Sequence, residues 1–211
     1  MRLRNVKDKE SIMNNSFYLI KNYLDYKGRW NSLFKNDNPI YIEIGMGKGQ
    51  FIINNALANP NINFIGIEKF DSIIALAIKK IDKIEINNLF MIRADALNIN
   101  DIFSNEISKI YLNFSDPWPK NRHHLRRLSS KIFLEKYNDI FCNKKEIEMR
   151  TDNKDLFTYS LVSFSNFGYK LDCVSLDFHS DLCPTITTEY EDKFSNQGMP
   201  IYYICCSMEE K

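Results

Sequence analysis

The chain has 211 residues, of which 44% are hydrophobic, so it is long enough to bury one sizeable core. Its 28 basic and 27 acidic residues give a net charge of only +1, which excludes a uniformly basic or acidic protein. No linker, low-complexity tract or internal repeat is visible. We therefore expect a single domain over residues 1–211, in which residues 1–38 form an N-terminal helical and basic extension.

Targeting and metal-binding signals are missing from the sequence. Residues 1–10 are charged throughout and lack the apolar core of a signal peptide, and no apolar run is long enough to cross a bilayer. Five cysteines without CxxC spacing argue against a disulfide framework or a zinc site. Cys173, His179 and Cys183 fit buried thiols and a loop histidine better than metal ligands. We expect a cytoplasmic protein with no membrane segment and no metal, either a monomer or a homodimer.

Strand-like and helix-like segments alternate after a helical segment predicted over residues 11–34. The predicted strands are Ile40–Ile44, Asn63–Ile67, Leu89–Ile92, Ile107–Phe114 and Ile147–Arg150, followed by an antiparallel pair, Tyr169–Leu176 and Ile201–Cys205. The predicted helices are Gln50–Ala58, Ser72–Ile84, Arg126–Tyr137 and Lys154–Phe164. Such alternation is typical of an α/β fold with a largely parallel, buried sheet. In these sheets, ligands bind at the carboxyl ends of the strands.

A glycine-rich loop, Glu43–Gly49, follows the first predicted strand. Its glycines, which let the backbone approach a ligand closely, are Gly45, Gly47 and Gly49. Their spacing is GxGxG and not the GxGxxG of dinucleotide sites, and the negative charge of Glu43 would oppose a pyrophosphate. S-adenosylmethionine has no phosphate and carries two positive charges, so an acid suits it.

Two further acids follow the next strands. Glu68 ends the second strand, where a carboxylate can accept hydrogen bonds from ribose hydroxyls. Asp95 follows the third strand, where it would be placed for the adenine amino group. Together with Glu43 these acids favour S-adenosylmethionine over a dinucleotide, although a plain tight turn with ordinary acidic loop ends remains the structural alternative.

The fourth long strand runs into Asp116-Pro-Trp-Pro119. The two prolines each fix one φ angle and remove one backbone donor, so we expect a stiff loop. Such a loop could present Asp116 and Trp118 to a nucleobase, as base-modifying enzymes do. Trp118 could equally be a core residue.

A basic segment follows this loop directly. From Lys120 to Lys131 the sequence has five Lys or Arg, two His and no acid. If the segment is α-helical, Arg122 with Arg126 and His123 with Arg127 lie four residues apart and form a cationic ridge that could hold phosphates. A solvated charged face is the alternative, and the histidines could cap or pack. Whether Arg2 and Arg4 also touch RNA stays open.

Two more segments fall at the predicted carboxyl edge. Asp152 follows the fifth strand and could cap the next helix or face a ligand. Thr188–Glu191 precedes the last strand, and Glu191 could be a ligand contact or an ordinary surface acid.

Taken together, these segments resemble the bacterial tRNA (guanine-N7-)-methyltransferase family, which methylates guanosine 46 in the variable loop of tRNA with S-adenosylmethionine. The matching segments, in family order, are Met1–Asn5, Glu43–Phe51, Gly66–Glu68, Arg93–Ala96, Asp116–Leu128, Thr151–Asp152 and Thr188–Glu191. Among them Asp116–Leu128 is the most specific. The sequence departs from the family pattern at Ser115, where proline is common, and at Leu125, where a basic residue is common.

The resemblance implies a Rossmann-like class I S-adenosylmethionine-dependent methyltransferase fold, with a mostly parallel seven-stranded sheet flanked by helices and an antiparallel last strand. It implies Asp116 as the catalytic residue and cofactor contacts from Glu43, Gly45, Gly47, Gly49, Glu68, Asp95 and Asp116. It implies guanosine contacts from Lys120, Asp152, Thr188 and Glu191, and tRNA contacts from Arg122, His123, His124, Arg126 and Arg127.

The chemistry can also be considered by itself. Guanine N7 has an in-plane lone pair and no proton, so methylation needs orientation and not a deprotonating base. Carboxylates near the ring would stabilise the positive charge that develops on the purine. We therefore expect Asp116 to act through its position and charge.

Three other functions fit the sequence less well. Methyltransferases that act on exocyclic amines often carry an Asp/Asn-Pro-Pro-aromatic loop at this strand end, whereas here the second proline follows the aromatic residue. A tRNA-binding subunit without catalysis would not need a complete cofactor site. A NAD-dependent oxidoreductase would leave Glu43 and the basic segment unexplained.

Overall fold

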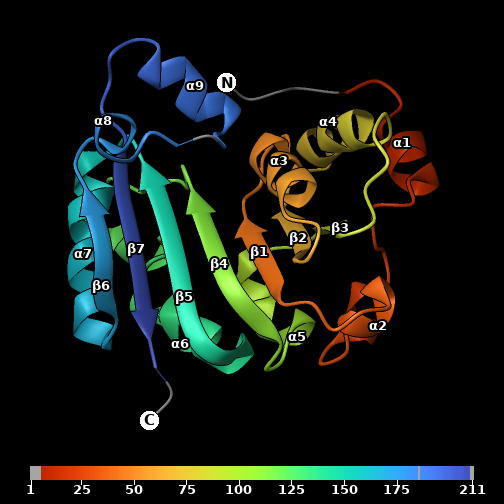
Figure 1. The fold of residues 1–211 in the computed structure, drawn as a ribbon, viewed down its shortest axis with the longest axis horizontal. Coiled ribbons are helices and arrows are strands. Elements are labelled where there is room, and N and C mark those ends of the chain that lie inside the picture. Colours follow the sequence, from red (N-terminus) through yellow and green to blue (C-terminus); the bar gives the residue numbers. More distant parts are fainter. Residues whose placement is uncertain (1–5, 185, 210–211) are drawn as a thin grey trace.

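The computed structural model describes residues 6–184 and 186–209, and its centre is one seven-stranded sheet in the order β3-β2-β1-β4-β5-β7-β6. The strands are β1 (Ile40–Ile44), β2 (Asn63–Glu68), β3 (Leu89–Arg93), β4 (Ile107–Asn113), β5 (Phe141–Thr151), β6 (Lys170–Ser175) and β7 (Tyr202–Met208). Strands β1 to β5 pair in parallel, and β7 lies antiparallel between β5 and β6 (Figure 1). The fold class predicted from the sequence is confirmed.

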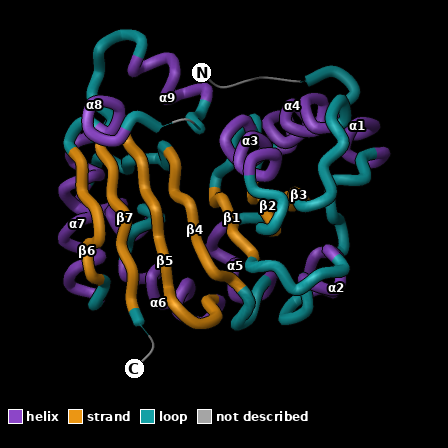
Figure 2. Tube along the Cα trace, viewed as in Figure 1, coloured by secondary structure: helices purple, strands orange, loops and turns teal. Residues whose placement is uncertain are grey.

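Helices cover the sheet unevenly. The longer ones are α3 (Gln50–Ala58), α4 (Asp71–Ile81), α6 (Lys131–Ile140) and α7 (Lys154–Phe167). The short ones are α1 (Lys9–Asn15), η1 (Tyr23–Tyr26), α2 (Asn31–Phe34), η2 (Ala96–Asn98), α5 (Ile99–Ile102), η3 (Asn121–Arg126), α8 (Phe178–Leu182) and α9 (Glu189–Ser195), where η marks a 3₁₀ helix. In the view of Figure 2, α3 and α4 lie in front of β1 to β3, α5 to α7 lie behind the sheet, and α8 and α9 sit at its upper edge.

Alternation along the strands divides the core in two. On β1, Ile40, Ile42 and Ile44 join the hydrophobic cluster that contains the residues of α6 and α7, whereas Tyr41 and Glu43 point to the opposite face. The second cluster packs α3 and α4 against β2 and β3. Glu43 is therefore placed on the α3 side of the sheet by the period of two along β1.

The predicted helical segment over residues 11–34 is not one helix. It breaks into α1, an extended stretch in which Leu19 bridges Met91, η1 and α2. Trp30 is fully buried in the main core and its Nε1 donates to the Ile102 carbonyl at 3.1 Å. The apolar residues at helical spacing belong to several short elements, because each of these elements packs on a different part of the sheet. Arg2 and Arg4 lie outside the described residues.

Two predicted helices differ in position from the observed ones. The helix predicted at Arg126–Tyr137 begins at Lys131, because residues 121–126 form the 3₁₀ helix η3. The helix predicted at Ser72–Ile84 is α4, which begins at Asp71 and already ends at Ile81.

Candidate active site

The carboxyl ends of the five parallel strands meet at one edge of the sheet, where the loops after β1 to β5 begin (Figure 1). The residues singled out from the sequence lie in these loops or at the strand ends: Glu43, Glu68, Asp95, Asp116 and Asp152. Segments that are far apart in the sequence are thus brought to the region where α/β sheets bind ligands.

The glycine loop between β1 and α3 is built for close approach by a ligand. Gly45 and Gly47 have φ angles of 80° and 56°, and a Cβ added to either would meet nothing within 4 Å. Gly49 also has a positive φ, but its Cβ would lie 3.2 Å from Ala77 Cβ of α4. Gly45 and Gly47 therefore open onto free space, whereas Gly49 lets α3 and α4 pack closely.

Glu43 is a buried carboxylate with one unused oxygen. Its Oε1 accepts a hydrogen bond from Asn113 Nδ2 at 2.9 Å, and its buried Oε2 has no partner among the described residues. Burial raises the pKa of Glu43 to about 7, although the Asn113 hydrogen bond and the positive charge of Arg150 oppose the shift. A positively charged ligand group beside Oε2 would favour the ionised form.

Glu68 ties the second strand end to the glycine loop. Its Oε2 accepts from Gly47 N at 3.1 Å, and its Oε1 accepts from Lys69 N and Phe70 N at 2.8 and 3.0 Å. Burial is the main reason that the pKa of Glu68 is raised, and the nearby charge of Asp116 raises it further. The structure thus brings Asp116 close to Glu68.

Asp95 is engaged at the start of η2. It accepts from Leu97 N at 3.0 Å and from Lys69 Nζ at 2.6 Å. Partial burial acts to raise its pKa, but these hydrogen bonds and the Lys69 charge hold the pKa of Asp95 below its ordinary value. Asp95 therefore remains an anionic acceptor at the third strand end.

The Asp116–Pro119 loop leaves the sheet beside this cluster. The Asp116 side chain is exposed, and Trp118 is half-buried and belongs to none of the hydrophobic clusters. The interpretation of Trp118 as a core residue is therefore wrong. Its φ angle is 43°, a left-handed value that is uncommon for a residue with a side chain.

The basic segment does not form the predicted α-helical ridge. In a 3₁₀ helix, residues three apart share a face, so His123 and Arg126 both turn toward Trp118. The His123 ring meets the indole edge-on at 5.7 Å, and the Arg126 guanidinium lies 5.0 Å from the indole centre. Lys120, Arg122, His124 and Arg126 are exposed, whereas Arg127 is only 7% exposed.

Asp152 is half-buried at the end of β5 and is not the cap of α7, because Asn153 accepts the capping hydrogen bond from Leu156 N at 2.8 Å. Tyr190 Oη lies 3.4 Å from Asp152 Oδ2, and the Tyr190 ring lies 5.0 Å from that of Phe114. Asp152 and the half-exposed Tyr190 thus form a polar and aromatic rim.

The side chains of Thr188 and Glu191 form hydrogen bonds with other groups of the protein. Thr188 Oγ1 accepts from Glu191 N, and Glu191 Oε2 accepts from Thr188 N, which forms a capping box at the start of α9. Glu191 is completely buried, with Arg150 Nη1 at 3.1 Å and His179 Nε2 at 2.9 Å. The interpretation of Glu191 as a surface acid is wrong, and its carboxylate faces away from solvent.

Sequence reasoning missed Arg150, which organises this corner. Its guanidinium donates to Glu148, Glu191 and the Ile186 carbonyl, and it lies 4.8 Å from the Phe51 ring centre and 4.6 Å from that of Phe178. The available signal is an arginine that alternates with Glu148 at the buried end of a central strand, because a buried charge requires partners.

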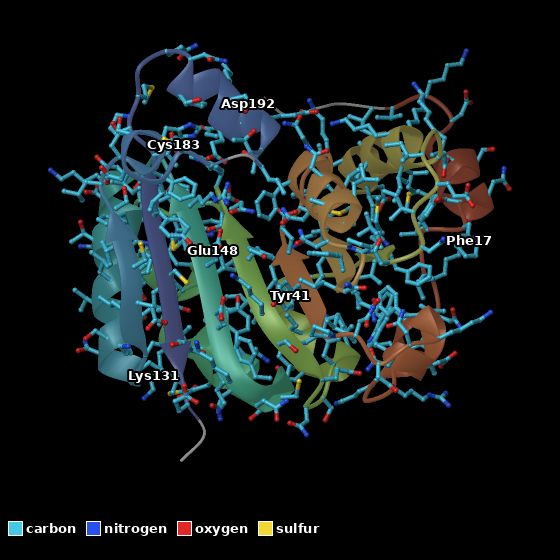
Figure 3. The ribbon with its side chains drawn as sticks, viewed as in Figure 1. Phe17, Tyr41, Lys131, Glu148, Cys183 and Asp192 are labelled. Carbon is cyan, nitrogen blue, oxygen red and sulfur yellow. The ribbon has the colours of Figure 1, made fainter. Side chains whose placement is uncertain are left out.

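Surface contacts also tie α9 to the glycine loop. Glu189 pairs with Lys48 at 2.7 Å and with Lys80, and Gln50 Nε2 donates to Asp192 Oδ2 at 2.9 Å. Figure 3 shows Asp192 on α9 above the strand ends. The segment from α8 to α9 therefore borders the site from the β7 side.

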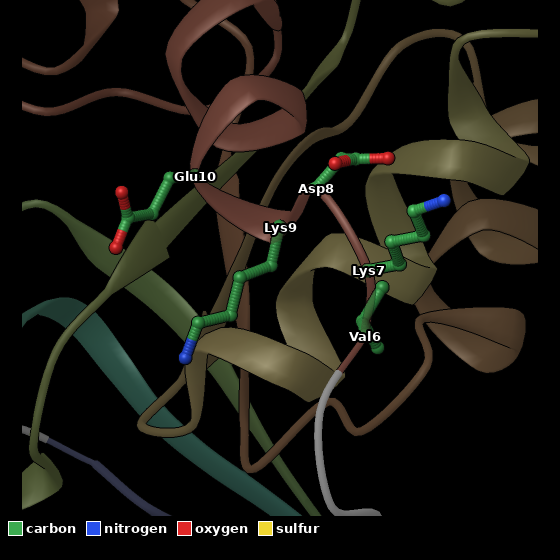
Figure 4. A pocket seen from close by; sticks show the side chains of 5 residues that line it. All are labelled: Val6, Lys7, Asp8, Lys9 and Glu10. Carbon is green, nitrogen blue, oxygen red and sulfur yellow. The ribbon is translucent and has the colours of Figure 1, made fainter.

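Other sites are not indicated among the residues that the structure describes. A hollow lined by Val6, Lys7, Asp8, Lys9 and Glu10 comes from one continuous segment at the start of α1 (Figure 4) and includes none of the predicted site residues. The described part of the chain contains no group of three or more metal-ligating side chains, and none of its helices has the length and apolar character needed to cross a bilayer.

Comparisons with known proteins show the family and the fold of the chain. Residues 37–204 match the family described as "Putative methyltransferase". An antibiotic-related methyltransferase of known structure superposes with a TM-score of 0.68 at 18% identity, covering 86% of this chain and 93% of that one, which shows a shared fold.

Two relatives are much more similar in sequence. The tRNA (guanine-N(7)-)-methyltransferase of Bacillus velezensis is 53% identical, covering 89% of this chain and 88% of that protein. The one of Lachnoclostridium phytofermentans is 44% identical over the full length of both proteins. The resemblance inferred from the motifs is thereby confirmed: the chain belongs to the tRNA (guanine-N(7)-)-methyltransferase family.

Proposed function

We propose that this protein transfers a methyl group from S-adenosylmethionine to N7 of guanosine 46 in the variable loop of tRNA. The family and the names of the relatives support the reaction and the substrate. The observation that carries the proposal is the carboxyl edge itself, where the buried, half-partnered Glu43, the open glycine loop and Asp116 lie next to exposed cations.

The cofactor site fits S-adenosylmethionine. When bound, S-adenosylmethionine supplies an electrophilic methyl group on a sulfonium. Glu43, with its free buried Oε2, would balance a positive charge of the cofactor, and Gly45 and Gly47 leave room beside the backbone. Glu68 and Asp95 remain the acceptors proposed for ribose and adenine, each already oriented by backbone N–H groups.

Asp116 is the group proposed next to the reacting atoms. Its loop follows β4, and its charge lies close enough to Glu68 to raise the pKa of that carboxyl. Because guanine N7 has no proton to lose, Asp116 would hold the base in line and stabilise the positive charge that the purine gains.

Separate groups of residues would hold the guanosine and the tRNA backbone. Asp152 is half-buried beside Tyr190 and suits the donor edge of guanine, with Lys120 at the opposite loop. Thr188 and Glu191 would shape this part of the site through the capping box. Arg122, His123, His124 and Arg126 would contact tRNA phosphates or bases, which is consistent with the expected cytoplasmic location.

One experiment tests the function directly. The purified protein is incubated with labelled S-adenosylmethionine and an unmodified tRNA transcript, and the methylated nucleoside is identified and mapped. We expect 7-methylguanosine at position 46 and no transfer to a transcript with adenosine there. Label on an exocyclic amine would instead support the alternative methyltransferase class, and binding of tRNA without transfer would support a non-catalytic subunit.

A further inference from the structure

The two prolines stiffen the Asp116–Pro119 loop, but they do not fix the conformation of Trp118 between them. Pro117 and Pro119 have no N–H, so the loop has few backbone donors for internal hydrogen bonds. Trp118 has a φ angle of 43°, and a side-chain-bearing residue keeps such a conformation only when its surroundings enforce it. Donors from outside the loop are required.

Arg127 supplies those donors. Its Nε donates to the Pro117 carbonyl at 2.9 Å and its Nη2 donates to the Trp118 carbonyl at 3.2 Å. Its guanidinium carbon lies 4.4 Å from the centre of the Tyr159 ring of α7. The planar guanidinium thus bridges two successive carbonyls and rests on an aromatic ring, a geometry that lysine cannot reproduce.

The same contacts leave Arg127 poorly placed for RNA. It is only 7% exposed, its Nε and Nη2 donate into the loop, and Tyr159 covers a face of its guanidinium. Arg122 differs because its side chain is exposed at the start of η3. The two arginines therefore have separate tasks within one basic segment.

We propose that Arg127 is a positioning residue, which fixes the Asp116–Pro119 loop for methyl transfer and makes no contact with tRNA. This role rests on the proposed function, since the loop carries the residue assigned to the reacting atoms. The exposed cations of the segment bind the polyanion, and the buried one sets the geometry.

The loop can be observed without substrate. Trp118 and Trp30 are the two tryptophans, and Trp30 is 0% exposed, so a collisional quencher such as acrylamide reports chiefly on Trp118. We expect Arg127→Gln and Arg127→Lys to increase quenching and shift the emission to longer wavelength, because the loop is released. Thermal unfolding monitored by circular dichroism verifies that each variant is folded, and if Arg127→Gln does not fold, Arg127→Lys carries the test.

Kinetics separate positioning from phosphate contact. Arg127→Lys should lower kcat by about 10²-fold with little change in KM for tRNA, since a small misplacement of reacting groups has effects of that order. The slope of log K for tRNA binding against log salt should stay at the wild-type value. Arg29→Lys, at an exposed arginine outside the site, is the matched control and should retain activity, while Arg122→Gln should reduce the slope by about 1.

Two results would overturn the proposal. One is Arg127→Lys with wild-type quenching and wild-type kcat. The other is a loss of about 1 in the salt slope for Arg127→Gln with kcat unchanged. Because quenching is measured without tRNA, a wild-type protein that fails to methylate tRNA would refute the proposed function while leaving the loop measurement to decide the role of Arg127.

Discussion

At the scale of single residues, the candidate acids differ in how many of their carboxylate oxygens already accept hydrogen bonds from the protein. Glu68 accepts three backbone N–H groups, and Asp95 accepts one backbone N–H and a lysine. Of these three acids, Glu43 alone is buried with an oxygen that has no partner in the described part of the chain. A buried acceptor without a partner is costly, so Glu43 gains most from a cationic ligand.

Glu43 should make cofactor binding depend on pH. Its raised pKa of about 7 means that a bound cation must favour loss of its proton. We expect the affinity for S-adenosylmethionine to rise as pH increases from 5.5 to about 7.5, with proton release detectable by calorimetry in buffers of different ionisation enthalpy. Glu43→Gln should bind weakly and without this pH step. A wild-type affinity that is flat across the range would contradict the assignment.

The raised pKa of Glu43 also lowers the stability of the cofactor-free protein at high pH. A carboxyl whose pKa is raised by folding contributes stability below its unfolded pKa of 4.5, and this contribution is lost as pH rises through about 7. Glu43→Gln should therefore be more stable than wild type at pH 8, by up to about 3 kcal/mol, in urea unfolding. Equal stabilities at pH 8 would mean that Glu43 is not strained by burial.

Asp116 is expected to act through charge. Asp116→Asn keeps the shape of the side chain but removes the negative charge that would stabilise the methylated purine. We expect single-turnover methylation to slow by about 10²-fold while cofactor affinity changes less. A near-wild-type single-turnover rate in Asp116→Asn would reject the electrostatic role.

At the scale of elements, the segment from α8 to α9 is held by two kinds of charge pair. Lys48 and Glu189 are about 40% exposed, and such surface pairs contribute about 0–1 kcal/mol. The Arg150–Glu191 pair is almost fully buried, where loss of one partner leaves an uncompensated charge. The buried pair therefore decides where α9 sits.

Arg150→Met should consequently lower the free energy of unfolding by about 3–5 kcal/mol, whereas Lys48→Met should lower it by about 1 kcal/mol or less. Urea unfolding measures both. Adding Glu191→Gln to Arg150→Met should restore part of the loss, because the buried charge is removed as well. Additive losses in the double variant would show that the two side chains do not interact.

At the scale of the whole molecule, affinity for a polyanion must come from charge distribution, since the net charge is only +1. The exposed strong cations of the basic segment are Lys120, Arg122, Arg126 and Lys131. Lys131 belongs to the same run in the sequence, but Figure 3 places it at the opposite end of the molecule from Asp192.

Replacing Lys120, Arg122 and Arg126 together by glutamine should reduce the slope of log K against log salt by about 3, at roughly 0.9 per phosphate contact. Filter binding over a range of salt concentrations gives this slope. Lys131→Gln serves as the matched control and should leave it unchanged. A triple variant with the wild-type slope would place the tRNA contacts elsewhere.

Local sequence patterns were enough to predict the fold class and the candidate acids at the carboxyl edge. Alternating strand and helix patterns predicted a largely parallel sheet, and Glu43, Glu68, Asp95 and Asp116 all follow or end parallel strands, which necessarily finish at one edge. These inferences depend on local patterns of spacing, which one stretch of chain contains completely.

Which of the predicted side chains can reach a ligand depends on contacts that appear only in the folded protein. The resemblance predicted Glu191 and Arg127 as ligand contacts. Glu191 is instead buried against Arg150, 41 residues away in the sequence. Arg127 donates to a loop ten residues before it. Asp152 could have been the cap of the next helix or a ligand contact, and the structure gives the cap to Asn153. The physical reason is that burial and hydrogen-bond partners are set by contacts between distant segments, so residue type and spacing alone do not specify them.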